Sequence, residues 1–70
     1  MAVSYKKLWK MLIDRDMTKT AMRKQAGIST GALAKLGRNE NVNTEVLVKI
    51  CTALHCDIAD IMEIVEDENQ

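Results

Sequence analysis

The sequence predicts an all-α protein, a compact bundle of five helices. Three observations favour this fold class. The 70 residues contain no proline and only three glycines, and 47% of them are hydrophobic. Apolar residues recur every three or four positions along most of the chain, which is the period of a helix that buries one face. We recognise no segment with the apolar–polar alternation of a half-buried strand.

The length of the chain fits a single domain over residues 1–70, with a frayed acidic tail over about 66–70. A domain of this size buries only about 60% of its unfolded surface, so we expect a thin stability margin. Lys6, Lys7 and Lys10 interrupt the early apolar run, which argues against a signal peptide. No apolar stretch approaches the roughly 18 residues of a membrane span. We therefore expect a soluble, cytoplasmic protein.

The first two helices are predicted from an apolar stripe and from end signals. The first runs from about Ser4 to Asp14, and its stripe consists of Tyr5, Leu8, Trp9, Leu12 and Ile13. We interpret Trp9 as a core anchor. The second helix begins at Thr18, a good N-cap, and ends at Gly27, which can adopt the left-handed conformation of a helix exit.

The third helix is predicted to have Ser29 as its N-cap and to run to about Arg38, with Ile28, Leu33 and Leu36 pointing inward. A polar loop over residues 39–43 follows, with Val42 tucked inward. The fourth helix begins at Thr44, and its buried stripe is Val46, Leu47, Ile50 and Leu54.

A fifth helix is predicted to be capped by Asp57. Its apolar face would consist of Ile58, Ile61, Met62 and Val65. Ile64 lies outside that face and has no obvious local partner.

The second and third helices carry the main functional signal. They are short, and a tight turn at Ala26-Gly27-Ile28 joins them. Two helices joined by such a glycine-containing turn form the unit that lays its second helix in the major groove of DNA. The outward side of the third helix is nearly free of bulky or acidic side chains, as entry into a groove requires.

The charge distribution agrees with a nucleic-acid partner, although the net charge of the chain is zero. Residues 1–38 contain nine basic and two acidic side chains, a balance of +7, whereas residues 39–70 contain one basic and eight acidic side chains, a balance of −7. A basic working face and an acidic end that avoids phosphate would account for this asymmetry.

Candidate contacts with duplex DNA follow from this arrangement. Lys19, Lys35 and Arg38 are expected to flank the duplex together with helix N-termini. Base reading falls to Thr30, Gly31, Lys35 and Ala34, with thymine methyl contacts from Thr30 and Ala34 and a guanine contact from Lys35. Because this polar set is sparse, we expect a contribution from DNA shape and from Asn39, Asn41 and Asn43 in the following loop.

Catalytic and metal-binding functions are disfavoured. The glycines match no phosphate-binding loop, and His55 belongs to no recognisable catalytic constellation. Cys51, His55 and Cys56 offer three candidate metal ligands, whereas a structural zinc site requires four. We interpret both cysteines as small buried apolar residues without a disulfide. No cofactor and no small-molecule pocket is expected.

The chain resembles the Cro/phage-repressor (XRE-like) helix-turn-helix family, also described as lambda-repressor-like DNA-binding domains. The resemblance extends from about Tyr5 to Val65 and is carried by Met17-Thr18, Met22, residues 26–29, Leu33, Leu36, Val46-Leu47, Ile50 and residues 53–61. It implies five helices, of which the second and third bind DNA, and a transcriptional regulator that is commonly dimeric on palindromic operators.

By the same resemblance, Lys19 and Arg38 match positions that contact the DNA backbone, and Thr30, Gly31 and Lys35 match base-reading positions. Arg23 stands where the family usually has alanine, so its stem either fits at the helix edge or reaches toward phosphate. Gly31 stands where a polar side chain is common, which weakens the expectation of strong direct readout.

The predicted function is that of a small regulator, a repressor that binds as a homodimer through the fifth helix, with Met62 and Ile64 at the contact. The alternative is a protein-interaction module, such as an antitoxin-like or adaptor subunit, that uses the acidic end of the fourth and fifth helices.

Overall fold

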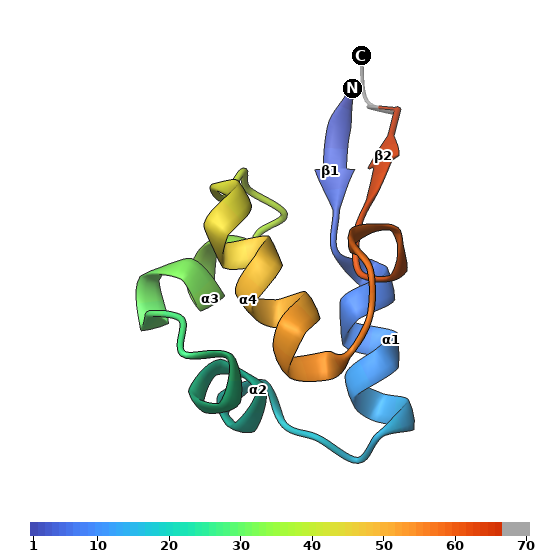
Figure 1. Cartoon of the computed structure of the whole chain (residues 1–70). Coiled ribbons are helices and arrows are strands. Elements are labelled where there is room, and N and C mark those ends of the chain that lie inside the picture. The colour runs from blue at the N-terminus through green and yellow to red at the C-terminus, as the bar shows by residue number, and fades with distance from the viewer. Residues whose placement is uncertain (67–70) are drawn as a thin grey trace.

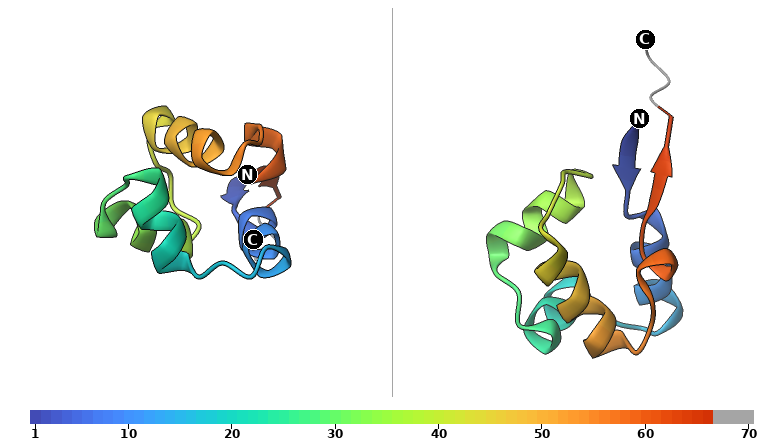
Figure 2. Two further views of the ribbon diagram at one scale, coloured as in Figure 1. Left: turned by 60° about the horizontal axis from the view of Figure 1, so that its bottom comes forward. Right: turned by 45° about the horizontal axis from the view of Figure 1, so that its top comes forward.

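The computed structural model describes residues 1–66 (Figure 1). Within them lie four α-helices, α1 (Lys6–Asp14), α2 (Lys19–Ala26), α3 (Thr30–Gly37) and α4 (Thr44–Leu54), and a 3-10 helix, η1 (Ile58–Asp60). Strands β1 (Ala2–Ser4) and β2 (Glu63–Val65) form an antiparallel pair. In Figure 1 and in the right view of Figure 2, α4 lies between α1 and α3, which places α3 at one edge of the bundle.

The predicted fifth helix is wrong. Asp57 caps a single 3-10 turn, with a reciprocal capping box to Asp60, and the chain then becomes extended. Glu63, Ile64 and Val65 alternate between half-buried and exposed, and Ile64 is paired in register with Val3. Side chains of a strand alternate between its two faces with a period of two residues, whereas those of a helix repeat every 3.6 residues. This alternation explains why Ile64 lies off the predicted helical face. The described fold is mostly helical with a small sheet, not all-α.

The first helix also begins later than predicted. Ser4, the predicted first residue of this helix, belongs to β1, and Tyr5 is the N-cap of α1, which begins at Lys6. The predicted starts of the other helices are confirmed. Thr18 caps α2 and Ser29 caps α3, and α4 begins at Thr44, where the side chain of Asn43 is the cap.

Each α-helix is followed by a residue with left-handed backbone conformation. Asp16, Asn39 and His55 have φ of 56° after α1, α3 and α4, and Gly27 has φ of 74° after α2. Such residues turn the chain sharply out of a helix while its last carbonyls still accept hydrogen bonds. Short connections between the helices result, as in the tight turn that sequence analysis predicts at Gly27.

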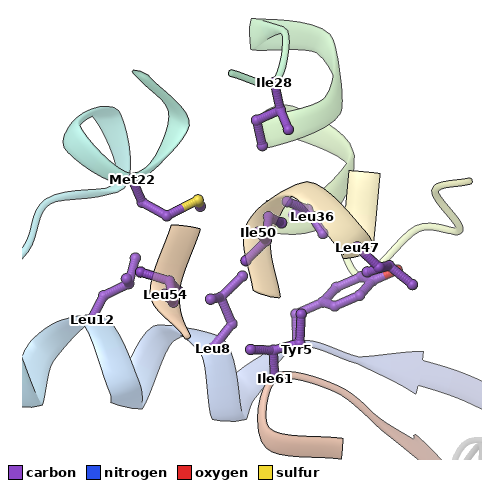
Figure 3. Packing of buried hydrophobic residues seen from close by; sticks show 10 residues of the cluster. All are labelled: Tyr5, Leu8, Leu12, Met22, Ile28, Leu36, Leu47, Ile50, Leu54 and Ile61. Carbon is purple, nitrogen blue, oxygen red and sulfur yellow. The ribbon is translucent and has the colours of Figure 1, made fainter. Parts of the chain in front are cut away.

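Ten buried apolar side chains from all four α-helices and the segments beside them form one core (Figure 3). They are Tyr5, Leu8, Leu12, Met22, Ile28, Leu36, Leu47, Ile50, Leu54 and Ile61. Seen close by, these side chains point toward one another, with α1 on one side and α2, α3 and α4 facing it. Most of the predicted inward residues are therefore buried or half-buried against this core.

The predicted stripe of α1 is too wide. Ile13 is 74% exposed, and Trp9 is half-buried at the edge of the core. Tyr5, Leu8 and Leu12 follow one another at intervals of three and four residues along one side of the helix. Trp9 is rotated by about 70° from the mean direction of these three residues, and Ile13 by about 110°. The placement of Ile13 in the core is thus wrong, and Trp9 is a flanking residue rather than a central anchor.

Candidate nucleic-acid interface

The unit formed by α2, the turn and α3 is built from local hydrogen bonds. The hydroxyl of Thr18 accepts from the backbone N–H of Ala21 at 3.0 Å, and that of Ser29 accepts from the N–H of Ala32 at 3.0 Å. These bonds satisfy N–H groups that the first turn of a helix leaves without a partner. At the exit of α2, the N–H of Gly27 donates to the carbonyl of Arg23 at 2.9 Å. The residues at these caps therefore set where α2 begins and ends and where α3 begins.

The two sides of α3 differ as the sequence predicts. Leu36 is completely buried, and Ala32 and Leu33 are half-buried against the core. Thr30, Gly31, Ala34 and Lys35 are exposed on the other side. Since α3 also lies at one edge of the bundle, these four residues form an accessible ridge of small side chains with one lysine (Figure 1). We refer to them as the α3 ridge.

A hollow of about 280 Å³ adjoins the α3 ridge, and sequence analysis did not foresee it. It lies between α3 and the start of α4 and is lined by Ser29, Gly31, Ala32, Lys35, Val42, Asn43 and Val46. The inward turn of Val42 was predicted, and this residue is half-buried in the wall of the hollow.

Lys19 is held at the beginning of α2 by an aromatic ring. Its Nζ lies 4.5 Å from the ring centroid of Trp9, a cation–π contact between α2 and α1. Lys19 remains exposed, so the contact positions the ammonium group without removing it from solvent. Trp9 thus supports a charged residue of the candidate interface.

Arg38 lies directly after α3 and is paired with Glu40. Its Nε is 2.6 Å from Oε2 of Glu40, and its Nη2 donates to Oε1 at 3.4 Å. The hydrogen bond from Arg38 lowers the pKa of Glu40, and the same bond raises the pKa of Arg38. Glu40 is not among the site residues predicted from the sequence, although an acidic residue two positions after a candidate DNA contact is a visible signal.

Two of the three asparagines in the loop after α3 form hydrogen bonds through their side chains to the backbone of the protein. Oδ1 of Asn39 accepts from the N–H of Tyr5 at 3.0 Å, and Oδ1 of Asn43 accepts from the N–H of Val46 at 3.1 Å. Asn41 is exposed and lines a second hollow, of about 430 Å³, between β1 and the end of α3. The side chain of Asn39 therefore has a structural role, because it joins the loop to the start of α1.

Arg23 turns toward the protein. Its Nη1 donates to the carbonyl of Ile28 at 3.4 Å, and the residue is half-buried. Of the two possibilities that the sequence left open, the structure shows the stem at the helix edge, where the guanidinium group bonds to the turn between α2 and α3.

The cysteines do not form a disulfide, and both are half-buried beside the core. Burial raises the pKa of Cys51 to about 11, with neighbouring Cys56 adding to the shift. Within residues 1–66, no group of three or more histidine, cysteine or acidic residues is placed to hold a metal ion. No helix in the same residues has the length and apolar character needed to cross a membrane.

Comparison with protein families gives a match to the Cro/C1-type HTH DNA-binding domain over residues 7–67. The chain belongs to this family. The match includes the whole of α2, α3 and α4, so the family assignment and the geometry of the exposed ridge concern the same segment.

Among solved structures, this Cro/C1-type domain is similar to the crystal structure of the transcriptional regulator VanUg, form II. The two chains share 53% sequence identity with a TM-score of 0.91, and the similarity covers 94% of this chain and 88% of that one. No curated protein matched the chain. For a Cro/C1-type domain, the α3 ridge and the cations beside it are the part of the surface to consider for DNA.

Proposed function

We propose that this chain is a small transcriptional regulator that binds duplex DNA by inserting the α3 ridge into the major groove. The observation that carries the proposal is the ridge itself: Thr30, Gly31, Ala34 and Lys35 are exposed on α3, at one edge of a Cro/C1-type domain. Its similarity to the regulator VanUg supports a regulatory role. The protein acts by binding rather than by catalysis.

Direct base contacts are assigned to the α3 ridge. Thr30 and Ala34 present methyl groups that can meet a thymine methyl, and Lys35 can donate to guanine. Gly31 exposes backbone without a side chain, which permits close approach of the groove wall. Because the ridge offers few hydrogen-bonding groups, sequence-dependent DNA shape supplies part of the specificity.

Lys19 and Arg38 are assigned to the DNA backbone, together with the exposed Asn41 of the loop after α3. Lys19 begins α2 and Arg38 follows α3, so the two cations lie at opposite ends of the helix-turn-helix unit. Contacts to phosphate fix the register of a protein on the duplex without reading bases. Arg23 and Asn39 are assigned an indirect part, because the side chain of each binds a backbone group of the protein.

We further propose that the regulator is a cytoplasmic repressor that acts as a homodimer on two half-sites about 34–36 Å apart. The contact is assigned to Ile64, which is 60% exposed on β2, together with the half-buried Met62. The segment is the same as the one predicted from the sequence, but it is a strand. Sedimentation of wild type and I64E tests this assignment: a dimer that I64E dissociates supports it, and a wild-type monomer on and off DNA contradicts it.

A salt titration of DNA affinity tests the proposed surface. Three cations neutralise phosphate in this arrangement, Lys19 and Arg38 by direct contact and Lys35 from its place in the groove beside guanine. They predict a slope of log K against log salt of about −2.7 for one protomer. The double variant K35A/R38A should lose about 1.8 of that slope. Its free energy of unfolding should change by no more than about 0.5 kcal/mol, as is usual for exposed sites.

The matched control is K6A/K10A, which removes two exposed lysines of α1 and the same net charge. Figure 1 places α1 on the side of α4 away from α3, so we expect little loss of affinity from this control. Equal losses in both double variants would mean that only net charge matters, and unchanged affinity in K35A/R38A would contradict the contact assignment.

A further inference from the structure

Glu40 places a negative charge within the surface assigned to DNA. Its carboxylate engages the Nε and Nη2 groups of Arg38 with its two oxygens, in the fork geometry with which arginine also binds phosphate. The Arg38 side chain is 60% exposed and that of Glu40 is 47% exposed, so both groups are accessible to a ligand. In the free protein, Glu40 therefore occupies the donors that a DNA phosphate would use.

The backbone holds Glu40 beside Arg38. The N–H of Glu40 donates to the carbonyl of Lys35 at 2.9 Å, and its own carbonyl accepts from the buried hydroxyl of Tyr5 at 2.8 Å. Between the paired residues, Asn39 has φ of 56° and binds the N–H of Tyr5 through its side chain. Since three hydrogen bonds hold this short segment, the fold places Glu40 beside Arg38.

The charges around Glu40 keep it ionised. The hydrogen bond from Arg38 has the largest effect in lowering the pKa of Glu40, and the positive charges of Arg38 and Lys35 lower it further. Two of the three cations assigned to DNA thus act on one carboxylate. A phosphate that approaches Arg38 or Lys35 meets this negative charge as well.

We propose that Glu40 is an intramolecular competitor of DNA phosphate, which occupies Arg38 in the free protein and lowers the affinity for duplex DNA. The inference rests on the proposed function. Binding of a phosphate to Arg38 requires exchange of one anionic partner for another, and repulsion between the carboxylate and the phosphate remains. Glu40 therefore makes tight binding depend on the contacts of the α3 ridge.

The test is E40Q, measured by fluorescence anisotropy with a labelled mixed-sequence DNA duplex over a series of salt concentrations. Glutamine retains the length of the side chain and the backbone carbonyl that Tyr5 uses, but not the charge. Loss of an exposed ion pair and of one repulsive charge should raise the affinity about two- to tenfold. The slope of log K against log salt should stay near −2.7, because the same three cations neutralise phosphate in both proteins.

The matched control is E66Q, an identical change at an exposed position after β2. It alters net charge equally and should raise affinity less than twofold if the position of Glu40 is decisive. A double-mutant cycle with R38A identifies the group through which Glu40 acts. In the R38A background, E40Q should raise the affinity for DNA less than in wild type. The remaining gain comes only from the loss of repulsion between the Glu40 carboxylate and phosphate.

Five outcomes decide the matter. A gain with E40Q that exceeds E66Q and shrinks in the R38A background supports the inference. Equal gains in E40Q and E66Q overturn it, because net charge would then be the cause. Unchanged affinity in E40Q also overturns it, since Glu40 would then not compete with phosphate. Reduced affinity overturns it as well, since Glu40 would then orient Arg38 for DNA. If wild type binds no duplex even at low salt, the proposed function fails as well, which distinguishes that failure from the others.

Discussion

Replacement of Gly31 by alanine separates the contribution of this residue to the fold from its contribution to DNA binding. A Cβ at this position would meet Oγ of Ser29 at 3.8 Å, an ordinary van der Waals distance, and the backbone is not left-handed. Alanine is therefore accommodated, and it is favoured over glycine in a helix by about 0.5–1 kcal/mol. The melting temperature should rise by about 2–8 °C in a domain of this size.

On DNA, the same substitution should have the opposite effect. The methyl group would stand on the α3 ridge, where it occupies the space that a close groove wall requires. An additional methyl group in a packed interface costs about 1–3 kcal/mol, which corresponds to roughly a 5- to 150-fold increase in Kd. Circular dichroism gives the stability, and anisotropy with a duplex selected from a random pool gives Kd.

Gly37 provides the matched control, because a Cβ there has no heavy atom within 4 Å and the residue ends the same helix. G37A should also stabilise the protein but change Kd by less than about twofold, well under the tenfold that corresponds to 1.4 kcal/mol. A decrease in stability for G31A would refute the packing argument. Equal values of Kd for G31A and G37A would refute the placement of Gly31 against DNA.

Three further predictions concern stability and reactivity. Y5F removes the 2.8 Å bond to the carbonyl of Glu40 and should lower the free energy of unfolding by about 1 kcal/mol in urea titrations, whereas an unchanged value would mean that the bond contributes nothing. H55G relieves a left-handed φ of 56° and should raise the free energy of unfolding by about 0.5–1 kcal/mol, so a loss of stability would contradict the C-cap argument. Because the pKa of Cys51 is raised to about 11, stability should fall as pH rises from 9 toward 11, where the unfolded thiol ionises first. A C56S variant removes the part of the shift that is due to Cys56, but burial still raises the pKa of Cys51. Alkylation of Cys51 at pH 8 in this variant should therefore be slower than for an ordinary thiol, and a normal rate would show that the thiol is not buried as described.

The helix-turn-helix unit is predictable from the sequence because its determinants are local. Thr18 and Ser29 lie at the N-cap positions and bond to N–H groups three residues later, and Gly27 has the left-handed conformation that its lack of a side chain permits. Each signal depends on neighbours within one turn. The exposed side of α3 follows, since Ile28 and Leu36 define the buried side by spacing alone.

The two-stranded sheet could not be predicted in the same way. Its pairing of Val3 with Ile64 joins the two ends of the described chain, and a three-residue strand has too little alternation to be distinguished from a helical turn. The apolar residues at 58, 61, 62 and 65 also match a helical period, so the local pattern favoured the wrong element. The one residue that did not fit the helical period was Ile64, which lay outside the predicted apolar face, and this misfit is what a strand would produce.

The roles of the charged side chains depend on carbonyl groups that are remote in sequence or hidden by the fold. Lys7 donates to the carbonyl of Ala59 at 3.2 Å, and Arg15 donates to that of Leu54 at 2.8 Å. Arg15 thereby satisfies the C-terminal end of α4, where a positive charge also interacts favourably with the helix dipole. Neither partner is visible in a count of basic residues.

These internal contacts change what the charge asymmetry means for DNA. The balance of +7 over residues 1–38 includes cations that the fold positions away from α3, and the carboxylate of Glu40 lies outside that range although it contacts Arg38. The field at the α3 ridge depends on Lys19, Lys35 and Arg38, reduced by Glu40. Counterion release counts only the charges that neutralise phosphate, so the salt slope of one protomer should be near −2.7 rather than the roughly −6 that seven cations would give. A slope near the larger value would mean that α1 also touches the duplex, and that the interface extends well beyond the helix-turn-helix unit.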